Sequence, residues 1–421
     1  MGTRKIVWPG LILAVGVVLA GCTSTSTSTS TSTPAGSTAT NPKAAKPAGS
    51  WLYPNGDLDN TRDAAGASIS SANVAGLQQA WTFKLPSSLV TSGPGFGSLA
   101  ATPIVANGVV YLQDLGDNVY ALALATGKLQ WEYRVSSKIV EGGPNGVALA
   151  GGVLYGDTTS TVFALSAATG KAIWVDRDLL SSAQGTFGIQ PLVANGRIYL
   201  ASSIGTGPTG GILLALNAAT GKLVWKFNTV VPASNGAQTP YGSGGAWETP
   251  VGEHSTSDNY PLEAMEHKLT LTAPYTILPG SLGGVLSNLA LAGNTVYVAT
   301  VDQQFTLAKM SYPLGAQDGR GTGEIEALNL TTGKVEWDTK VPAYPLGAAT
   351  VSNDLVFTTL YTGVLIALDR TTGAVVYQRK LPTSGNAPIA IAGNSVLVPA
   401  GGPNLFGPKG GSPQLVVYTV R

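Results

Sequence analysis

The sequence is poor in cysteine and in charge. Its 421 residues include a single cysteine, Cys22, so no disulfide can form within one chain. Charged residues make up 11% of the chain, whereas about a quarter is usual in soluble domains. The formal net charge is +1, and the body of the chain has no basic run. Because nucleic-acid binding depends on clustered Lys and Arg, the sequence argues against a nucleic-acid partner.

The N-terminus carries an export signal. Arg4 and Lys5 precede an apolar stretch, residues 6–20, that is short for a membrane span of about 20 residues. A basic start, a short apolar run and small residues before the cleavage point are typical of a secretory signal. The stretch ends in Leu-Ala-Gly-Cys (19–22), which resembles the lipobox of bacterial lipoproteins. The resemblance implies that Cys22 is lipidated and becomes the mature N-terminus; a plain signal peptide with a chance cysteine is the alternative.

The chain divides into three parts by composition. Residues 1–21 are the predicted signal peptide. Residues 22–50 hold the lipidated cysteine and a Thr/Ser/Pro-rich stretch that lacks large apolar side chains, so it cannot offset the entropy cost of ordering and is expected to be a disordered tether. Residues 51–421 are long enough for a large core. We therefore expect an exported body, lipid-anchored on the outer face of the cytoplasmic membrane.

The body contains an internal repeat, and this decides the fold class. One phrase occurs five times, with an apolar run, a Thr-Gly turn and a second run that ends on an aromatic residue: 120–131, 163–174, 214–225, 326–337 and 366–377. A second phrase, two apolar runs around a glycine turn, comes earlier in most units, as in "PIVANGVVYL" (103–112). Each phrase is typical of a β-hairpin, so one unit of about 40 to 50 residues supplies four antiparallel strands. The sequence predicts an all-β protein, a β-propeller of four-stranded blades.

The aromatic residues and the two chain ends predict how the blades join. Each closing aromatic lies on an outermost strand, where its ring can pack over the turn of the neighbouring blade. Residues 77–85 form an outer strand with no blade before it, and residues 414–420 form a strand with no outer partner. We expect these N- and C-terminal strands to pair in one blade, which removes an exposed sheet edge. One blade for each closing aromatic residue, together with one hidden unit, gives about seven blades, and residues 226–288 could hold one more.

Two stretches near the ends of the body resemble a known family. "WLYPNGDLDNTR" (51–62) and "PLGAATVSNDLVFTTLYTGVLIALDRTTGAVVYQRKLP" (345–382) are similar to the first and last blades of pyrroloquinoline quinone (PQQ)-dependent alcohol dehydrogenases. The resemblance covers nearly all of 51–421 and implies eight blades, with PQQ and calcium as cofactors. The repeat phrase alone indicates only the fold, because non-enzymatic propellers share it. One such group is the lipoprotein subunit that helps to assemble outer-membrane β-barrels.

The residues that the family uses at its quinone are mostly replaced. "GGAW" (244–247) resembles the motif of the tryptophan that stacks on the quinone, so Trp247 is the one cofactor-binding residue carried over. The stretch that would hold the adjacent cysteine pair has no cysteine and has Asn145 where the family has arginine. Thr206 replaces the calcium-ligating glutamate, Thr209 replaces a second arginine, and Val301 stands where a Lys or Arg would touch the quinone. No motif for the catalytic base is found, so no catalytic residue is assigned.

Two other stretches are candidate sites. "GTGPTG" (205–210) fits a dinucleotide-binding pattern, but a strand follows it where that fingerprint needs a helix, so a hairpin loop is favoured. Residues 252–269 replace the regular phrase and contain the metal-capable side chains Glu253, His254, Asp258 and His267. Their spacing matches no established metal motif, which favours a solvated loop over a metal site.

These observations leave three hypotheses about function. The first is a binding or scaffold protein with a decayed quinone site, which takes a protein or small-molecule ligand at a propeller face. The second is a PQQ-dependent, alcohol dehydrogenase-type oxidoreductase with a divergent site. The third is a metal- or ligand-binding surface protein that uses residues 252–269. The membrane, through the lipid anchor, is a partner in each.

Overall fold

A computed structural model describes twelve stretches of the chain, which lie in its larger compact unit, Lys46–Arg421. The described residues are 49–85, 97–135, 146–177, 179–180, 184–203, 211–228, 275–277, 284–302, 305–307, 321–385, 387–402 and 411–420. Within them the one helical element is a 3₁₀ turn, η1 (Val74–Gly76), and everything else regular is β-strand. No helix in this part of the chain has the length and apolar character to cross a membrane. The predicted all-β class is confirmed.

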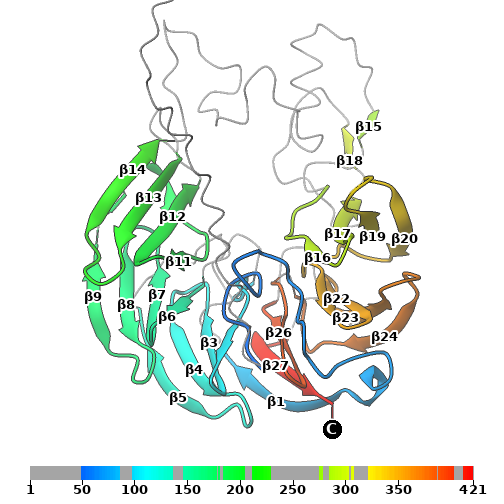
Figure 1. Ribbon diagram of the computed structural model, residues 1–421, viewed down its shortest axis with the longest axis horizontal. Helices are drawn as coiled ribbons and strands as arrows, with labels where there is room; N and C mark the ends of the chain where they lie inside the picture. The colour runs from blue at the N-terminus through cyan, green and yellow to red at the C-terminus, as the bar shows by residue number, and fades with distance from the viewer. Residues whose placement is uncertain are drawn as a thin grey trace, which may run out of the picture. The chain divides into compact units, whose positions relative to one another are not determined.

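The strands form five four-stranded antiparallel sheets, one five-stranded sheet and one two-stranded pair (Figure 1). Five of the six sheets follow the chain strand by strand: β2 (Ile104–Ala106), β3 (Val109–Gln113), β4 (Val119–Ala123), β5 (Leu129–Tyr133); β6 (Ala148–Ala150), β7 (Val153–Asp157), β8 (Val162–Ser166), β9 (Ala172–Asp176); β11 (Leu192–Ala194), β12 (Arg197–Ser203), β13 (Ile212–Asn217), β14 (Leu223–Asn228); β16 (Ala290–Ala292), β17 (Thr295–Asp302), β19 (Thr322–Asn329), β20 (Val335–Val341); and β21 (Thr350–Ser352), β22 (Leu355–Leu360), β23 (Val364–Asp369), β24 (Val375–Lys380). Short β10 (Thr186–Phe187) also pairs with β12, and β15 (Tyr275–Ile277) pairs with β18 (Phe305–Leu307).

The sixth sheet joins the two ends of the body. Its order is β1 (Gln78–Lys84), β27 (Gln414–Thr419), β26 (Ser395–Ala400), β25 (Ala390–Ala392), so an N-terminal strand is outermost. β1 and β27 are antiparallel, and their register runs from Gln78 opposite Thr419 to Lys84 opposite Gln414. The predicted pairing of the terminal strands is confirmed. The described residues contain these six sheets, and the full number of blades stays a prediction.

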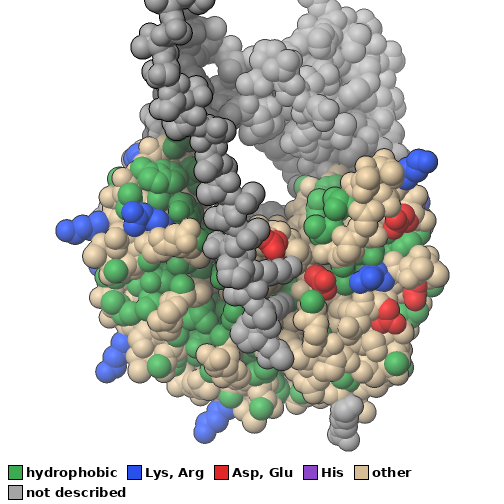
Figure 2. All heavy atoms as spheres, in the orientation of Figure 1, with side chains coloured by type: hydrophobic (Ala, Val, Ile, Leu, Met, Phe, Trp, Pro, Cys, Tyr) green, Lys and Arg blue, Asp and Glu red, His purple; other side chains and the backbone are tan. Residues whose placement is uncertain are grey.

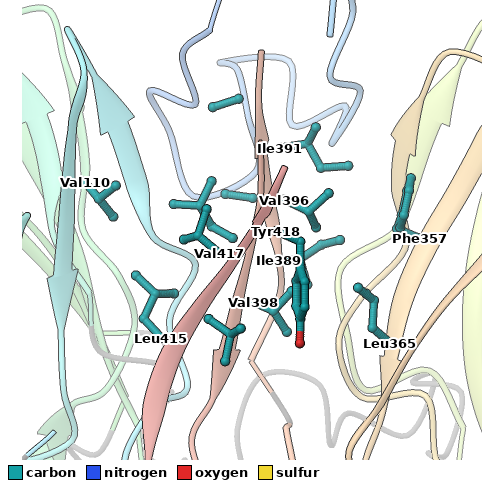
Figure 3. Close-up of a cluster of buried hydrophobic side chains, with 14 of the residues drawn as sticks. Val110, Phe357, Leu365, Ile389, Ile391, Val396, Val398, Leu415, Val417 and Tyr418 are labelled. Atoms are coloured by element: carbon teal, nitrogen blue, oxygen red, sulfur yellow. The ribbon is translucent and has the colours of Figure 1, made fainter. Parts of the chain in front are cut away.

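Hydrophobic packing joins this terminal sheet to both neighbours. Its β-branched and aromatic side chains alternate between two faces, so both faces bury apolar surface. Figure 3 shows Leu415, Val417 and Tyr418 of β27 in one cluster with Val110 of β3 and Phe357 of β22. All five side chains are at most 1% exposed. The core therefore lies between successive sheets, as in a stack of blades.

The strands of each sheet have distinct positions. First strands of neighbouring sheets contact one another, for example β25 with β2 and β21 with β25, so these edges converge. The second and third strands are largely buried, and the fourth strands, such as β24, are largely exposed. A sheet thus runs from a shared inner edge to an outer strand at the surface.

The tryptophans connect each outer strand to the next sheet, as predicted. Trp131 of β5 donates its Nε1–H to the carbonyl oxygen of Ala167, just beyond β8 of the next sheet, at 3.0 Å. Its ring covers Gly170, where a Cβ atom would lie 2.5 Å from the ring. Trp81, Trp174 and Trp337 repeat the hydrogen bond, to Leu124, Ala218 and Arg370. Trp131, Trp174 and Trp337 are half-buried, so their contribution is below that of a fully buried indole.

The N-terminal segment, residues 49–68, contacts the first strands of four sheets. Trp51 exchanges two backbone hydrogen bonds with Val105 of β2, each 2.8 Å. Farther along, the carbonyl oxygen of Thr61 accepts a hydrogen bond from the N–H of Leu291 in β16. The carbonyl oxygen of Arg62 accepts one from the N–H of Val351 in β21. Ser68 then donates its N–H to Gly393, in the turn after β25. These bonds occupy inner-edge groups that would otherwise be unpaired.

Candidate functional site: the connection face

The two ends of the sheets differ in their loops. We call the end with the first-to-second and third-to-fourth turns the turn face, and the end with the other two kinds of connection the connection face. The turns of the turn face are short and fully described. Residues 136–145 join the fourth strand of one sheet to the first strand of the next, and residues 403–410 join the second strand of the terminal sheet to the third. Long loops on a rigid scaffold are where binding residues tend to lie, so the connection face is the candidate site.

Most of the predicted site residues lie outside the described part of the chain. Trp247 and the metal candidates Glu253, His254, Asp258 and His267 are among them, as are Cys22, Asn145, Thr206 and Thr209. Among the described residues, no three His, Cys, Asp or Glu side chains gather closely enough to hold a metal ion. For "GTGPTG" the flanking elements are described: β12 and β13 pair antiparallel on its two sides. A strand, not a helix, follows the motif, as the hairpin interpretation requires.

Val301 lies in an apolar corner of the connection face. It is near the end of β17, is 1% exposed, and packs with Tyr344 and Tyr361. The two tyrosine rings lie 6.2 Å apart between centroids, and the Tyr361 N–H donates to the carbonyl oxygen of Tyr344. Gly321 fits beneath them, because a Cβ there would come within 2.1 Å of Tyr344. The described surroundings of position 301 are apolar and aromatic.

A buried carboxyl group closes a loop on the same face. Asp114, directly after β3, is fully buried and accepts hydrogen bonds from the N–H groups of Gly116 and Asn118 at 2.9 Å. The hydroxyl of Tyr120 donates to its second oxygen at 2.8 Å. Burial raises the pKa of Asp114, and the hydrogen bonds only partly oppose this. Because its oxygens are already bonded within the loop, Asp114 has a structural role.

Amide side chains link neighbouring sheets beside this loop. Gln113, the last residue of β3, donates Nε2–H to the carbonyl oxygen of Asp157 at 2.7 Å. Gln190 donates to the carbonyl oxygen of Val147 at 2.8 Å, and so joins the third sheet to the second. The Asp157 side chain is fully buried. The inner part of the connection face is therefore acidic and amide-rich here.

Hydroxyl groups and glycines fill the connection face of the β21–β24 and terminal sheets. Thr358, Thr359 and Ser98 are fully buried, and within the described stretches their hydroxyl oxygens have no hydrogen-bond partner. Gly347 donates its N–H to the carbonyl oxygen of Thr359, and Gly402 donates to Ser384. A Cβ at Gly347 would lie 2.0 Å from the Thr359 hydroxyl oxygen. The region is close-packed, small and neutral.

The buried cation of the described residues lies elsewhere. Arg62, in the N-terminal segment, is fully buried and is the one Lys or Arg in this part of the chain that is. Its guanidinium donates to the carbonyl oxygens of Ala349 at 2.9 Å and Ile389 at 2.8 Å, and to the hydroxyl of Thr350 at 2.7 Å. It also lies 5.4 Å from the centre of the Trp51 ring. Burial lowers the pKa of Arg62 to about 9, so the charge is kept at neutral pH.

Sequence reasoning missed Arg62. The stretch around it, "DLDNTRD" (57–63), has no periodicity, and its charges are three aspartates and this one arginine. Only the fold shows that one side chain joins the N-terminal segment to two first strands. Its signal in the sequence was a single Arg among three aspartates, which is typical of a solvated charged turn and does not predict burial.

Comparison with known families decides the identity of the fold. A family model described as outer membrane protein assembly factor BamB matches residues 136–244 and 247–411, more than half of the chain. The model of the glucose/ethanol/alcohol dehydrogenase β-propeller domain matches residues 51–147. The chain belongs to the PQQ-like β-propeller family. Its six described sheets are accordingly blades.

The propeller is also similar to individual quinoproteins. It is 29% identical to a quinohemoprotein alcohol dehydrogenase, ADH-IIG, of Pseudomonas putida, over 44% of this chain and 26% of the relative. It is 24% identical to the quinoprotein glucose dehydrogenase of Escherichia coli, over 73% of this chain and 41% of the relative. The chain thus spans well under half the length of these two curated relatives. The structure of the quinohemoprotein alcohol dehydrogenase from Comamonas testosteroni has a TM-score of 0.67 at 16% identity, with 90% of this chain and 81% of that chain covered.

The described connection face offers PQQ buried hydroxyl groups but no buried cation. The cofactor is a tricarboxylate, so a buried site for it needs cations or several hydrogen-bond donors. The described connection face offers the buried carboxyls Asp114 and Asp157, the apolar Val301 corner and small hydroxyls. Arg62 bonds to main-chain and hydroxyl oxygens at the first strands. Within the described stretches, then, no cation is placed to hold the quinone.

The face shown in Figure 2 carries few charges. Its Lys, Arg, Asp and Glu side chains stand singly among hydrophobic and uncharged surface. Several outer-strand apolar residues are exposed, among them Trp225 at 40% and Phe227 at 61% on β14. The low charge content seen in the sequence is thus visible as scattered charges on this face.

Proposed function

We propose that the protein is an exported, lipid-anchored PQQ-like β-propeller that acts as a binding or scaffold protein and whose quinone site has decayed. Export and anchoring are supported by the basic start, the apolar run 6–20 and Cys22 at the end of the Leu-Ala-Gly-Cys sequence. The anchored chain would stand on the outer face of the cytoplasmic membrane. A scaffold role agrees with the family model that covers most of the body, whose description is an assembly factor.

Val301 is the observation that carries the loss of the quinone site. The resemblance to the dehydrogenases implies a Lys or Arg at this position, in contact with the quinone. Here the side chain is apolar, 1% exposed and packed against two tyrosines. A cation could not be accommodated there without burying an unpaired charge. A quinone stacked on Trp247, where the resemblance places it, would then lack this cationic partner.

Addition of PQQ and calcium to the purified protein tests this proposal. We expect no quinone absorbance on the protein after gel filtration, and no reduction of an artificial dye with an alcohol as substrate. Trp247→Phe is the matched variant: any weak quinone signal that depends on stacking at this site falls in the variant, and a nonspecific signal does not. Stoichiometric quinone with alcohol-dependent dye reduction contradicts the proposal.

A quinoprotein oxidoreductase with a divergent site is the second candidate. It is favoured by the curated relatives, which carry quinoprotein dehydrogenase names. In that case Trp247 contacts the quinone, and residues of the connection face outside the described stretches supply the cations. The same titration separates the two candidates, because only the second gives a bound quinone that turns over.

A further inference from the structure

We propose that the turn face of the propeller faces the membrane and that the connection face points away from it. This inference rests on the proposed lipid anchor at Cys22. It assigns the turn face a partner, a lipid surface. It also leaves the connection face, with its long loops, as the side from which a ligand or protein approaches.

The described chain enters the body at the turn face. Gly49 is the first described residue, and its Cα lies 3.4 Å from the position that a Cβ would take on Gly393. Gly393 belongs to the first-to-second turn between β25 and β26, so it lies on the turn face. Gly49 and Ser50 share a small surface pocket with Ile391 and Gly393. The anchor is thus connected to the body at this face.

The entry point is also close to the converging inner edges. Trp51, two residues after Gly49, is hydrogen-bonded to Val105 of β2. Ser50 and Trp51 are buried, so the chain is fixed from this point onward. Arg62 fixes the same segment farther along, through its hydrogen bonds to Ala349, Thr350 and Ile389. The tether therefore leaves the propeller near the centre of the turn face and not from its rim.

The length of the tether makes the entry point decisive. A flexible chain the length of residues 23–48 has a root-mean-square span of about 30 Å. A folded body of about 370 residues is roughly 50 Å across. To bring the connection face to the lipid, the tether has to pass from the centre of one face around the body, which stretches it to about twice its relaxed span. The turn face is reached with no such stretch.

Two matched pairs of positions report the orientation. Lys128 and Arg134 directly flank β5, with Lys128 in a turn of the turn face and Arg134 at the opposite end. At β20, Lys334 directly precedes the strand at the turn face, and Lys340 is its last residue but one, at the opposite end. All four side chains are exposed, and the members of a pair are six positions apart along extended chain, about 20 Å. Cysteine at each position, one at a time, accepts a fluorescent donor.

Energy transfer from the donor to an acceptor on lipid headgroups is then measured on vesicles. The mature chain carries Cys22→Ser and an N-terminal polyhistidine tag, and it is bound to vesicles that contain nickel-chelating lipid. We expect several-fold more efficient transfer from Lys128→Cys and Lys334→Cys than from Arg134→Cys and Lys340→Cys. Equal transfer within each pair, or the reverse order, overturns the proposal. Released protein, after addition of imidazole, should show no transfer from any position.

Flotation of the natively expressed protein with membranes tests the lipid anchor separately. If the native protein floats and its Cys22→Ser variant does not, the lipid anchor is supported, and the transfer measurement then decides the orientation. If the native protein does not float, the proposed anchoring is wrong, and so is the orientation in the cell, whatever the tagged chain shows. Equal transfer on vesicles with intact flotation removes the orientation and leaves the anchor standing.

Discussion

On the turn face, five third-to-fourth turns place a glycine at nearly the same angle, with φ between +67° and +74°. On the connection face, the corresponding ends of second strands carry different chemistry: Gln113 bonds to a neighbouring blade, Val301 packs on tyrosines, and Thr359 lies against a glycine. The same blades therefore repeat at one end and diverge at the other. Repetition indicates a requirement of the architecture, and divergence indicates where a specific ligand or partner is recognised.

The largest effect is expected for the N-terminal segment that crosses the inner edges. Arg62→Ala leaves two buried carbonyl oxygens and the Thr350 hydroxyl without their donor, so we expect a loss of about 3–5 kcal/mol in the free energy of unfolding. Denaturant unfolding measures it. The control is Arg379→Ala, which removes a half-buried guanidinium that bonds to the single carbonyl oxygen of Leu77 and should cost about 1 kcal/mol. Equal losses would show that Arg62 does not hold the segment.

Replacement of a tryptophan between blades should have the second-largest effect on stability. Trp337→Ala removes a ring that covers Gly373 and a hydrogen bond of 2.9 Å to Arg370, and we expect a loss of about 3 kcal/mol. Trp225, 40% exposed on β14, is the matched control, with an expected loss of about 1 kcal/mol on replacement by Ala. A loss at Trp225 as large as that at Trp337 would mean that a part of the chain outside the described residues covers Trp225.

Glycine substitutions separate backbone angle from ring contact. Gly170→Ala and Gly333→Ala both force a side chain into a positive φ, +69° and +67°. At Gly170 the new methyl group also meets the Trp131 ring, whereas nothing described lies within 4 Å of its place on Gly333. Thermal unfolding should therefore show a further loss of about 2 kcal/mol at Gly170. If the two variants are equally stable, the Trp131 contact is not tight.

The smallest expected effect is on the pH dependence of stability, to which Asp369 on the turn face and Asp114 on the connection face should contribute with opposite signs. Asp369 is the half-buried last residue of β23, at the turn face. Side-chain and backbone hydrogen bonds from Thr372 lower its pKa, so its contribution to stability is present above the ordinary pKa and is lost as pH falls through the lowered folded value. Burial raises the pKa of Asp114, so its contribution is full at low pH and is lost as pH rises through the raised folded value. Asp369→Asn should therefore become more destabilising, and Asp114→Asn less destabilising, between pH 3 and pH 7. Urea unfolding across that range measures both slopes, and slopes of the same sign would contradict this assignment.

The sequence predicted the parts of the fold that depend on local periodicity. The hairpins, the positive φ of the Thr-Gly turns, the tryptophan contacts and the pairing of β1 with β27 all follow from residue patterns that repeat or that complement each other at the chain ends. The repeated signal made these inferences strong, because an error at one unit is corrected by the others.

The N-terminal segment and the connection face could not be predicted in the same way. Arg62 acts through contacts with Ala349 and Ile389, nearly the whole length of the body away in sequence, and no local pattern encodes them. The buried Asp114 loop and the Val301 corner each occur once, so no repeat marks them. For Trp247 and the metal-capable residues of 252–269, which lie outside the described residues, the sequence hypotheses stay predictions.

The amount of PQQ retained per chain tests the central claim most directly. Purified protein is incubated with excess PQQ and calcium, passed through a desalting column, denatured, and assayed for released quinone. The account predicts no quinone above the level carried by a propeller-free control protein. Retention of one PQQ per chain, lost when calcium is chelated, would contradict the claim that the connection face has lost its quinone site.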